Sequence, residues 1–462
     1  MTPGQKVCAH AGVRRPGHSP QTAVAAVRVL IAGAGPAGLA AAVSLQQAGI
    51  PGQEIAVLEA GPRAGGLASG FRGAETWEWA IERYYHHLFT NDTDILAFTR
   101  ELDLQDMVEI HSPVTAYWYR GRPLRLDSPA SLLAVPGLSL PDKVRMGMVL
   151  AWLRWHPLPP WHRHDTVTAH AWLERWMGRR AYEALWRSLL EGKFGRRYRD
   201  VSLAWFAARI YKRTSRLGYF RGGFQAWTDA VREKVEQGGT EVGFNTPLTL
   251  VEPQGGTLAV RSGQRSWEGV QAVLYTGSPN LLGRIAPALP ATYRARLAGE
   301  AHMGAVVLTA ALDRSLLNDV YWLSIPADAG LPFLALVEHT AMIPKERYGG
   351  HHILYLGTYV EQDHPWLSLP EQEVAEELLA GLSRIRPGFD DSWVRGRWLN
   401  RTAWAQPIPM PGSGRTRLPL HTPLSGLYLA TMSQVWPWDR GTNYAVRIGK
   451  QAARRILVDL QV

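Results

Sequence analysis

The 462-residue chain contains one cysteine, Cys8, and this scarcity excludes several classes of protein. A single thiol cannot build a disulfide framework, a thiolate zinc site or an iron–sulfur cluster, and it suits a reducing compartment. The chain also lacks any basic run of five residues and any nucleic-acid motif, so its net charge of +10 predicts a generally basic surface. We therefore expect a cytoplasmic protein with no nucleic-acid partner and no metal site.

Long hydrophobic runs are also scarce. The strongest candidate for a membrane span begins near Val27, but it is rich in glycine, so no transmembrane helix is predicted. Residues 1–23 lack hydrophobic periodicity, which indicates a flexible tail and not a signal peptide. The overall composition, 46% hydrophobic and 19% charged, is that of a globular protein with more than one core.

The clearest motif is the glycine-rich turn GAGPAG at residues 33–38. It follows the apolar, β-branched segment 27–32 and precedes a predicted helix over 39–48, as in a dinucleotide-binding unit. In such a unit the first glycine permits a tight turn, the second lets backbone approach a pyrophosphate, and the third lets helix and strand pack closely. The residues predicted to contact the nucleotide here are Gly33, Ala34, Gly35, Pro36, Ala37 and Gly38.

An acid at the end of the second predicted strand, EIAVLEA, narrows the choice of nucleotide. Glu59 lies 21 residues after Gly38, where a carboxylate accepts hydrogen bonds from ribose hydroxyls. Its charge would repel the 2′-phosphate of NADP, which leaves NAD and FAD.

The residues after Glu59 carry a family resemblance. With that acid, the R-x-G-G motif formed by Arg63, Gly65 and Gly66 resembles the flavin-containing amine oxidase superfamily, particularly its protoporphyrinogen oxidases and phytoene desaturases. The resemblance implies FAD as the cofactor. The contacts that it implies in this segment are Glu59, Ala60, Arg63, Gly65, Gly66 and Leu67, the last standing where the family usually has an arginine.

Two later segments resemble the same family. Residues 241–279 predict three short strands followed by the strand AVLYTG, and the family contacts the adenine side at the position of Leu248. The C-terminal sequence GLYLATMSQVWPWDRGTNYAVRIG resembles the flavin motif, in which a strand, a loop and a helix face the isoalloxazine. The contacts implied in this motif are Met432, Gly441, Thr442 and Asn443.

This C-terminal motif departs from the family at one point. Thr431 and Met432 stand where the family has Gly-Asp, and the aspartate normally helps with the ribityl and pyrophosphate groups. Ser433 or Gln434 is the candidate polar replacement.

The order of these motifs predicts an α/β protein with two discontinuous domains. A Rossmann-like FAD/NAD(P)-binding domain is assigned residues 24–79, 218–288 and 418–462. A substrate-binding domain of mixed α/β structure, with a helical insert, takes residues 80–217 and 289–417. Its pattern predicts mostly helix over 80–215, strands at AVVLTAAL and HHILYLGTYV, and an amphipathic helix at EQEVAEELLAGLSRI.

Candidate catalytic residues lie in the substrate-binding domain. Tyr84, His86 and His87 follow the R-x-G-G segment closely, so the family's fold implies a place near the flavin, although a packed turn explains them equally well. Adjacent histidines point to different sides of the chain, which does not favour a metal site. Lys193 lies in a glycine-flanked stretch that resembles a substrate-side loop of protoporphyrinogen oxidases, while a solvated basic loop is the alternative.

Further segments each allow two interpretations. Glu338 and His339 could face the substrate, but such a pair in a β domain is more often structural. Residues 142–162 are apolar with interleaved Trp and Arg, so they could lie in a membrane interface, with a buried helix slightly favoured. The tryptophans that could belong to an active-site wall or to a core are Trp398, Trp404, Trp436 and Trp438.

Together these features predict an FAD-dependent oxidoreductase that removes hydride from a C–H/C–N or C–C unit of a large, apolar small molecule. Oxygen or another acceptor would reoxidise the flavin, and the aromatic and histidine side chains would orient the substrate. Two alternatives remain open: a non-redox flavoenzyme acting on a sugar nucleotide, like UDP-galactopyranose mutase, and a non-catalytic FAD-binding protein.

Overall fold

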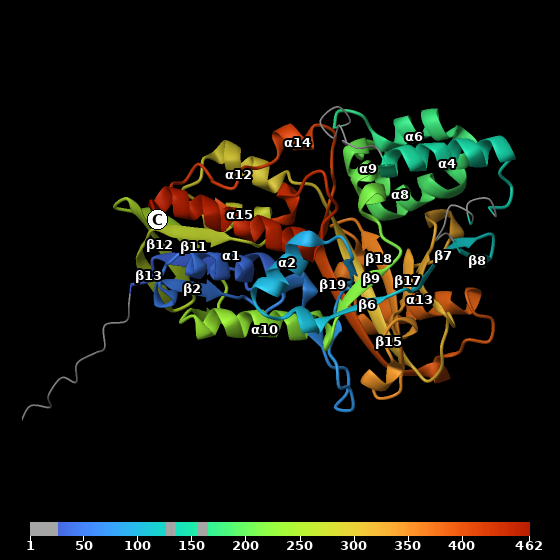
Figure 1. Ribbon diagram of the computed structural model, residues 1–462, viewed down its shortest axis with the longest axis horizontal. Coiled ribbons are helices and arrows are strands. Elements are labelled where there is room, and N and C mark those ends of the chain that lie inside the picture. The colour runs from blue at the N-terminus through green and yellow to red at the C-terminus, as the bar shows by residue number, and fades with distance from the viewer. Residues whose placement is uncertain (1–25, 126–130, 132–134, 156–164) are drawn as a thin grey trace, which may run out of the picture.

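The computed structural model describes residues 26–125, 131, 135–155 and 165–462. The predicted tail with Cys8, and residues 156–162 of the candidate membrane segment, lie outside these ranges. The described chain forms a five-stranded parallel sheet and a seven-stranded mixed sheet, with a group of helices beside the second sheet (Figure 1). This arrangement confirms the predicted α/β fold class; the predicted domain boundaries stay a prediction.

Four strands of the parallel sheet are short, fully apolar and buried, as parallel strands usually are, whereas its edge strand β10 is partly exposed. Alternate residues of the first strand enter different cores, Val29 and Ile31 on one face and Leu30 and Ala32 on the other. The strand order, with bounds, is β10 (Glu241–Gly243), β2 (Ile55–Leu58), β1 (Val29–Ala32), β14 (Ala272–Tyr275) and β20 (Leu427–Leu429).

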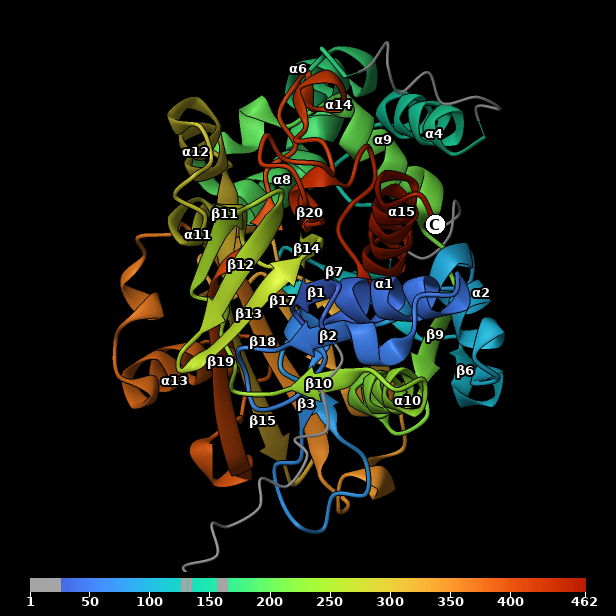
Figure 2. The same ribbon diagram turned by 90° about the vertical axis from the view of Figure 1, so that its left-hand side faces the viewer.

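Each face of this sheet has its own cover, which Figure 2 shows from the side. One face packs against α1 (Pro36–Gln47), α10 (Gly223–Gln237) and α15 (Thr442–Leu460). The other face packs against the predicted three-stranded segment and two short helices. Their bounds are β11 (Leu250–Gln254), β12 (Thr257–Ser262), β13 (Arg265–Val270), α11 (Pro279–Ile285) and α12 (Ala291–Ala298).

The second sheet contains the strands predicted at AVVLTAAL and HHILYLGTYV, and the helix predicted at EQEVAEELLAGLSRI is α13 (Glu371–Ala380), which covers one of its faces. One of its central strands, β15, is buried along its whole length of 11 residues. In order the strands are β19 (Val394–Pro407), β15 (His302–Leu312), β18 (His352–Val360), β17 (Ala335–Glu338), β16 (Val320–Ser324), β7 (Val114–Tyr119) and β8 (Arg122–Arg125).

The prediction of mostly helix over 80–215 is wrong for its first half. The segment VTAYWY is rich in β-branched and aromatic residues, and as β7 it joins the second sheet beside β16. Short strands and one helix make up most of the remainder: β4 (Ile81–Glu82), β5 (Leu88–Phe89), β6 (Val108–His111) and α2 (Thr93–Glu101). The strands pair with β3 (Gly70–Phe71) and β9 (Leu217–Phe220), which lie outside this range.

The helical part begins at residue 140 and occupies the upper right of Figure 1. Its helices share a core of their own, separate from the core under α13. They are α4 (Leu140–Trp155), α6 (Ala169–Met177), α7 (Arg179–Ala181), a π-helical turn (Tyr182–Trp186), α8 (Arg187–Phe194) and α9 (Leu203–Lys212); a short helix, α14 (Ser413–Thr416), lies later in the chain.

A buried carboxyl group connects the two sheets. Glu82 of β4 is 1% exposed and accepts hydrogen bonds from the Tyr219 hydroxyl at 2.9 Å and from the Phe224 amide at 2.7 Å. The Tyr355 hydroxyl of β18 donates to the Glu82 carbonyl at 2.7 Å. Burial raises the pKa of Glu82 to about 7, because the charged form is poorly solvated there.

This raised pKa predicts a pH-dependent stability. Folding favours protonated Glu82, so its stabilising contribution is complete below pH 4.5 and is lost as the pH rises through about 7. Between pH 5 and 8 this loss lowers the free energy of unfolding by an amount on the order of 2–3 kcal/mol. The neutral isostere, Glu82→Gln, should not show this decline. Urea unfolding between pH 5 and 8 measures this difference, with exposed Glu75→Gln as the control. Parallel pH profiles for wild type and Glu82→Gln would contradict it.

Candidate cofactor and substrate site

The glycine turn places the start of α1 at the carboxyl end of β1. Gly33 has φ +114°, a conformation that favours glycine, and α1 begins three residues later at Pro36. A Cβ atom on Gly38 would lie 1.9 Å from the Gly33 carbonyl oxygen, so the helix rests directly on the backbone of the turn. The unpaired amides of the first helical turn consequently point toward the space above the strand, where an anion binds well.

A second glycine loop lies against the first. The Gly65 amide donates to the Ala34 carbonyl at 3.0 Å, and a Cβ on Gly35 would lie 3.8 Å from the Gly66 Cα. Both Gly35 and Gly66 retain solvent exposure. These two side-chain-free loops therefore leave room for a pyrophosphate between them, as the motif predicted.

Glu59 is held in position by the same loops. Its carboxylate accepts hydrogen bonds from the Ala34 amide at 2.8 Å and the Gly61 amide at 2.9 Å. A carboxylate has about four lone-pair positions, so two remain for ribose hydroxyls. Arg63 instead donates to the Gly70 carbonyl at 2.8 Å and so braces the R-x-G-G loop.

The other predicted contacts in this half differ in exposure. Ala60 is exposed and Leu67 is partly exposed, so a ligand can reach both. Leu248 lies just before β11 and is 9% exposed, so backbone is the main surface that it offers.

The helix of the predicted flavin motif packs closely on α1. A Cβ on Gly449 of α15 would lie 2.1 Å from the Ala37 carbonyl oxygen, so the two backbones touch. Thr442, the first residue of α15, precedes Gly449 by seven residues, which puts the start of α15 about 10 Å beyond this contact. The predicted face formed by Ala445, Ile448, Ala452 and Ile456 is buried.

Two polar side chains near the start of α15 have structural partners. The Asn443 side-chain oxygen accepts from the amides of Asp94 at 2.9 Å and Ile95 at 3.1 Å, so it satisfies the start of α2. The Gln434 side-chain oxygen accepts from the Thr431 amide, and its nitrogen donates to three backbone carbonyls, including that of Leu429 at 2.9 Å.

The remaining positions of this motif are more open. Met432 and Gly441 are partly exposed, whereas Thr442 is buried. The Ser433 hydroxyl is partly exposed and lies 2.9 Å from the His302 ring, so of the two candidate replacements for the family's aspartate it is the more accessible.

The segment with Tyr84, His86 and His87 crosses the second sheet. Tyr85 packs edge-on against Trp322, with ring centroids 5.0 Å apart, and lies over Gly357 of β18. His87 contacts Trp322 and lies 3.2 Å from the Tyr321 hydroxyl. All of 84–87 stay partly exposed, so this segment forms an aromatic surface that a ligand can reach.

Burial sets the protonation of these side chains. It lowers the pKa of His86 to about 4 and that of His87 to about 3, and it raises the pKa of Tyr84 to about 12. At neutral pH all three are therefore uncharged, which suits contact with an apolar molecule.

Lys193 lies in an aromatic and ionic environment that its loop did not suggest. Its Nζ is 3.0 Å from a carboxylate oxygen of Asp439 and 5.2 Å from the centroid of the Trp205 ring. Tyr359 of β18 flanks the same ammonium at 5.4 Å. Asp439 stands two residues before Gly441, so Lys193 belongs to the predicted flavin end of the site.

Arg440 connects Lys193 with the 84–87 segment. Its guanidinium donates to the Tyr359 hydroxyl at 2.6 Å and to the Gln406 side chain at 3.0 Å. Its charge also acts on Tyr85 and His86. His86, His87 and Lys193 therefore lie around the loop that precedes α15, and Tyr84 belongs to the same segment as the two histidines. Sequence reasoning missed Arg209, Arg213, Tyr359, Gln406, Asp439 and Arg440, although Asp439 and Arg440 are quoted within the flavin motif.

The remaining candidates are mostly structural. Glu338 and His339 are each 1% exposed; Glu338 accepts from the Leu316 amide at 3.1 Å, and His339 bonds the Tyr348 hydroxyl at 2.8 Å. Among the tryptophans, Trp398 packs on Trp77 in the second sheet, Trp404 on His302, and Trp436 donates to Asp165. Only Trp438 adjoins the start of α15, where it stacks on Tyr444 at 5.8 Å.

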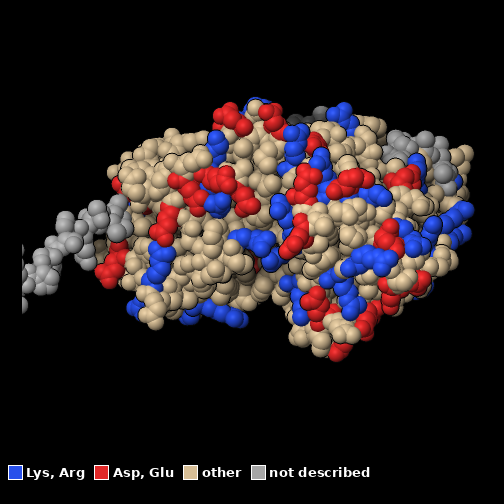
Figure 3. All heavy atoms as spheres, turned by 90° about the horizontal axis from the view of Figure 1, so that it is seen from below, with Lys and Arg blue, Asp and Glu red and all other residues tan. Residues whose placement is uncertain are grey.

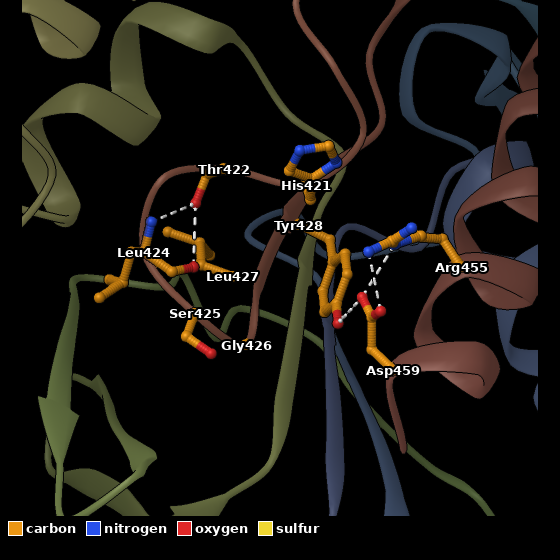
Figure 4. Close-up of a pocket in the computed structure, with 9 residues that line it drawn as sticks. All are labelled: His421, Thr422, Leu424, Ser425, Gly426, Leu427, Tyr428, Arg455 and Asp459. Atoms are coloured by element: carbon orange, nitrogen blue, oxygen red, sulfur yellow. Dashed lines mark hydrogen bonds and ion pairs between the residues drawn. The ribbon is translucent and has the colours of Figure 1, made fainter. Parts of the chain in front are cut away.

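A separate surface hollow lies at the opposite end of the parallel sheet. It has a volume of about 340 Å³ and opens where β20 begins, beside the end of α15. Figure 4 shows Tyr428 directed at Asp459, with Arg455 paired to the same carboxylate. These internal pairs, and the distance from the glycine turn, separate it from the cofactor site. Figure 3 shows that basic and acidic residues are interspersed on the face drawn.

Comparisons with known proteins agree with this geometry. Residues 36–457 match the family described as flavin containing amine oxidoreductase, so the chain belongs to that family. A search of curated proteins finds no match. The protein is accordingly an FAD-dependent oxidoreductase, and the predicted cofactor is confirmed.

Solved structures share the whole fold at low identity. One, assigned as a protoporphyrinogen oxidase from Exiguobacterium sp. 255-15, is 16% identical, with a TM-score of 0.73 over 94% of this chain and 99% of that one. Cyclohexylamine oxidase from Brevibacterium oxydans IH-35A is 18% identical, with a TM-score of 0.70 over 95% and 100%. Reduced UDP-galactopyranose mutase is 17% identical, with a TM-score of 0.71 over 93% and 95%.

The two glycine loops predict contrasting effects of adding one methyl group. Gly35→Ala has room in the free protein, so it should fold normally while its Cβ occupies pyrophosphate space and weakens FAD binding about 10-fold or more. Gly38→Ala collides with backbone at 1.9 Å and should destabilise the fold itself. Thermal unfolding of FAD-free protein, with FAD titration by flavin fluorescence, separates the two. Equal FAD affinity in Gly35→Ala and wild type would contradict a pyrophosphate site between Gly35 and Gly66.

Proposed function

We propose that this oxidoreductase removes a hydride and a proton from a C–H/C–N or C–C unit of a large, apolar small molecule. FAD supplies the hydride-accepting chemistry when bound, and oxygen or another acceptor restores it. The proposal rests on one observation: the 84–87 segment and Lys193 both lie close to the loop that precedes α15. Arg440 of that loop is near both, since it bonds Tyr359 beside Lys193 and its charge acts on His86. A substrate placed there would contact both.

In this proposal the chain's own residues bind and orient the substrate. Uncharged Tyr84, His86 and His87, with the aromatic rings around them, hold its apolar body and exclude water. Lys193 keeps a fixed position because Asp439 and the Tyr359 ring hold its ammonium. The proton that leaves the substrate passes to solvent, since the two histidines are weak bases.

A second candidate is non-redox flavin chemistry on a sugar nucleotide. Two observations favour it: the similarity of fold to UDP-galactopyranose mutase, and the number of cations near Asp439, which suits a pyrophosphate. The two candidates differ in whether the substrate itself reduces the flavin.

A peripheral membrane contact is also proposed, on the outer side of α4. Large hydrophobic side chains recur along one stripe of this helix and are exposed: Leu140, Val144, Met148, Trp152 and Trp155. Trp176 of α6, 51% exposed, continues the surface, which arginines of both helices flank. Such a surface fits an anionic membrane interface, and the protein would act in the cytoplasm against it. No helix in the described ranges is long and apolar enough to cross a bilayer.

Anaerobic spectroscopy of the FAD-loaded protein tests the oxidation proposal. Amines, porphyrinogens, carotenoid precursors and sugar nucleotides are added in turn, and an apolar donor should bleach the visible flavin band. Lys193→Met should slow this bleaching by about 10-fold or more because substrate positioning is lost, whereas exposed Lys234→Met should not. If no compound bleaches the flavin and only pre-reduced protein converts a sugar nucleotide, oxidation is wrong and the mutase-like candidate is favoured.

Vesicle sedimentation tests the membrane proposal. Vesicles with anionic lipid should bind the protein more strongly than neutral ones, and Trp155→Ser should weaken that binding about 10-fold. Val458→Ser removes an equally exposed hydrophobic residue on α15, outside the stripe, and should have no effect. Absence of binding to either kind of vesicle would exclude the contact.

A further inference from the structure

A concentration of positive charge lies beside the proposed substrate position. Four basic side chains, which we call the cationic cluster, come together from three elements: Lys193, Arg209, Arg213 and Arg440. Lys193 and Arg209 both pair with one oxygen of Asp439, and Arg440 follows Asp439 in the chain. In the described part of the chain, Asp439 is the one carboxylate that pairs with any member, so three positive charges are uncompensated.

Arg213 is the member without a partner. It follows the last residue of α9, and within the described ranges it makes no hydrogen bond or ion pair. Its residue is exposed to solvent, yet surrounding protein lowers the pKa of its guanidinium to about 10. Its charge acts on Arg209 and on His87, so the side chain lies between the end of α9 and the 84–87 segment.

This arrangement is costly without a ligand. Arg209 and Arg213 are four residues apart at the end of α9, where like charges repel, and partial burial reduces the screening by water. The local potential is strongly positive: although burial raises the pKa of the Tyr359 hydroxyl, Arg440 and Lys193 bring it below its usual value. A bound anion would remove this repulsion, and a guanidinium with free donors suits a carboxylate or phosphate.

The cluster is distinct from the site for the FAD pyrophosphate. That group has its own cradle between Gly35 and Gly66, next to the start of α1. The cluster instead adjoins Tyr359 and the 84–87 segment, on the second sheet. An anion held here would therefore belong to the substrate.

We propose that the cationic cluster binds an anionic group, a carboxylate or a phosphate, carried by a substrate whose remaining part is apolar. This inference rests on the proposed function, because it assigns a substrate class to the same site. The anionic group lies against Arg213 and Arg209, and the apolar part lies along the 84–87 surface. Cationic substrates are excluded by the same charges.

Three probes with the same eight-carbon chain test the proposal on the FAD-loaded protein: octanoate, octyl phosphate and octylamine. Each is titrated while the flavin spectrum and tryptophan fluorescence are recorded, since the Trp205 ring lies against Lys193 and Arg209 of the cluster. At least one anion should bind, and octylamine should not. Tighter binding of octanoate identifies a carboxylate ligand, and tighter binding of octyl phosphate identifies a phosphate.

Arg213→Gln should raise the half-saturating concentration of the anion on the order of 10-fold, since one charged contact is lost. Arg216→Gln is the matched control, because Arg216 is an exposed arginine three residues further on, outside the cluster. Equal binding of octylamine and both anions, failure of both anions to bind, or equal effects of the two substitutions would overturn the inference.

Failure of the proposed function has a different signature. If no donor bleaches the flavin while the anions still bind through Arg213, oxidation is wrong and the anion site stands. If a neutral or cationic donor bleaches the flavin and neither anion binds, oxidation stands and the anion site is wrong.

Discussion

Backbone contact between α1 and its neighbours is the constraint on which the site depends. Gly38 lets α1 rest on the turn that starts it, and Gly449 lets α15 rest on α1. A side chain at either position would push these elements apart by about 1 Å or more, because the atoms met are backbone and cannot rotate away. The two helix starts, one for the pyrophosphate and one for the flavin ring, are therefore held at a nearly fixed spacing.

The second constraint is electrostatic and joins segments that no sheet connects. Asp439 ties α8 and α9 to the loop before α15, and Arg440 ties that loop to β18. Three cations hold the pKa of the Asp439 carboxyl well below its usual value, despite burial. The carboxylate therefore stays charged across the physiological range, and the substrate side of the site keeps its shape through ion pairs and not through apolar packing alone.

The nucleotide end could be predicted almost entirely from the sequence, because its determinants are local. A strand, three spaced glycines, a helix and an acid lie within residues 27–59, and each has one physical interpretation. The substrate end could not be predicted to the same degree. Lys193 and Asp439 are far apart in the chain, and nothing at either position indicates the pairing.

The helix predicted where β7 lies has a similar explanation, because its structure depends on neighbours distant in the chain. Periodicity did not separate β7 from helix, because a six-residue aromatic strand beside β16 is stabilised by its neighbour. The Asn443 side chain serves the start of a different helix, α2, and the flavin contact predicted for the amides at this helix start stays a prediction. Side-chain direction of this kind depends on tertiary neighbours that a motif does not specify.

The strand order of the parallel sheet has a consequence for how the protein is made. β1 lies between β2 and β14, yet β14 is encoded more than two hundred residues later, and β20 and α15 come later still. At usual elongation rates the ribosome needs on the order of tens of seconds to supply these partners. During that interval the emerging glycine-turn unit has one face and one edge uncovered, which invites binding by chaperones. Cofactor capture must therefore wait until these distant segments have been made.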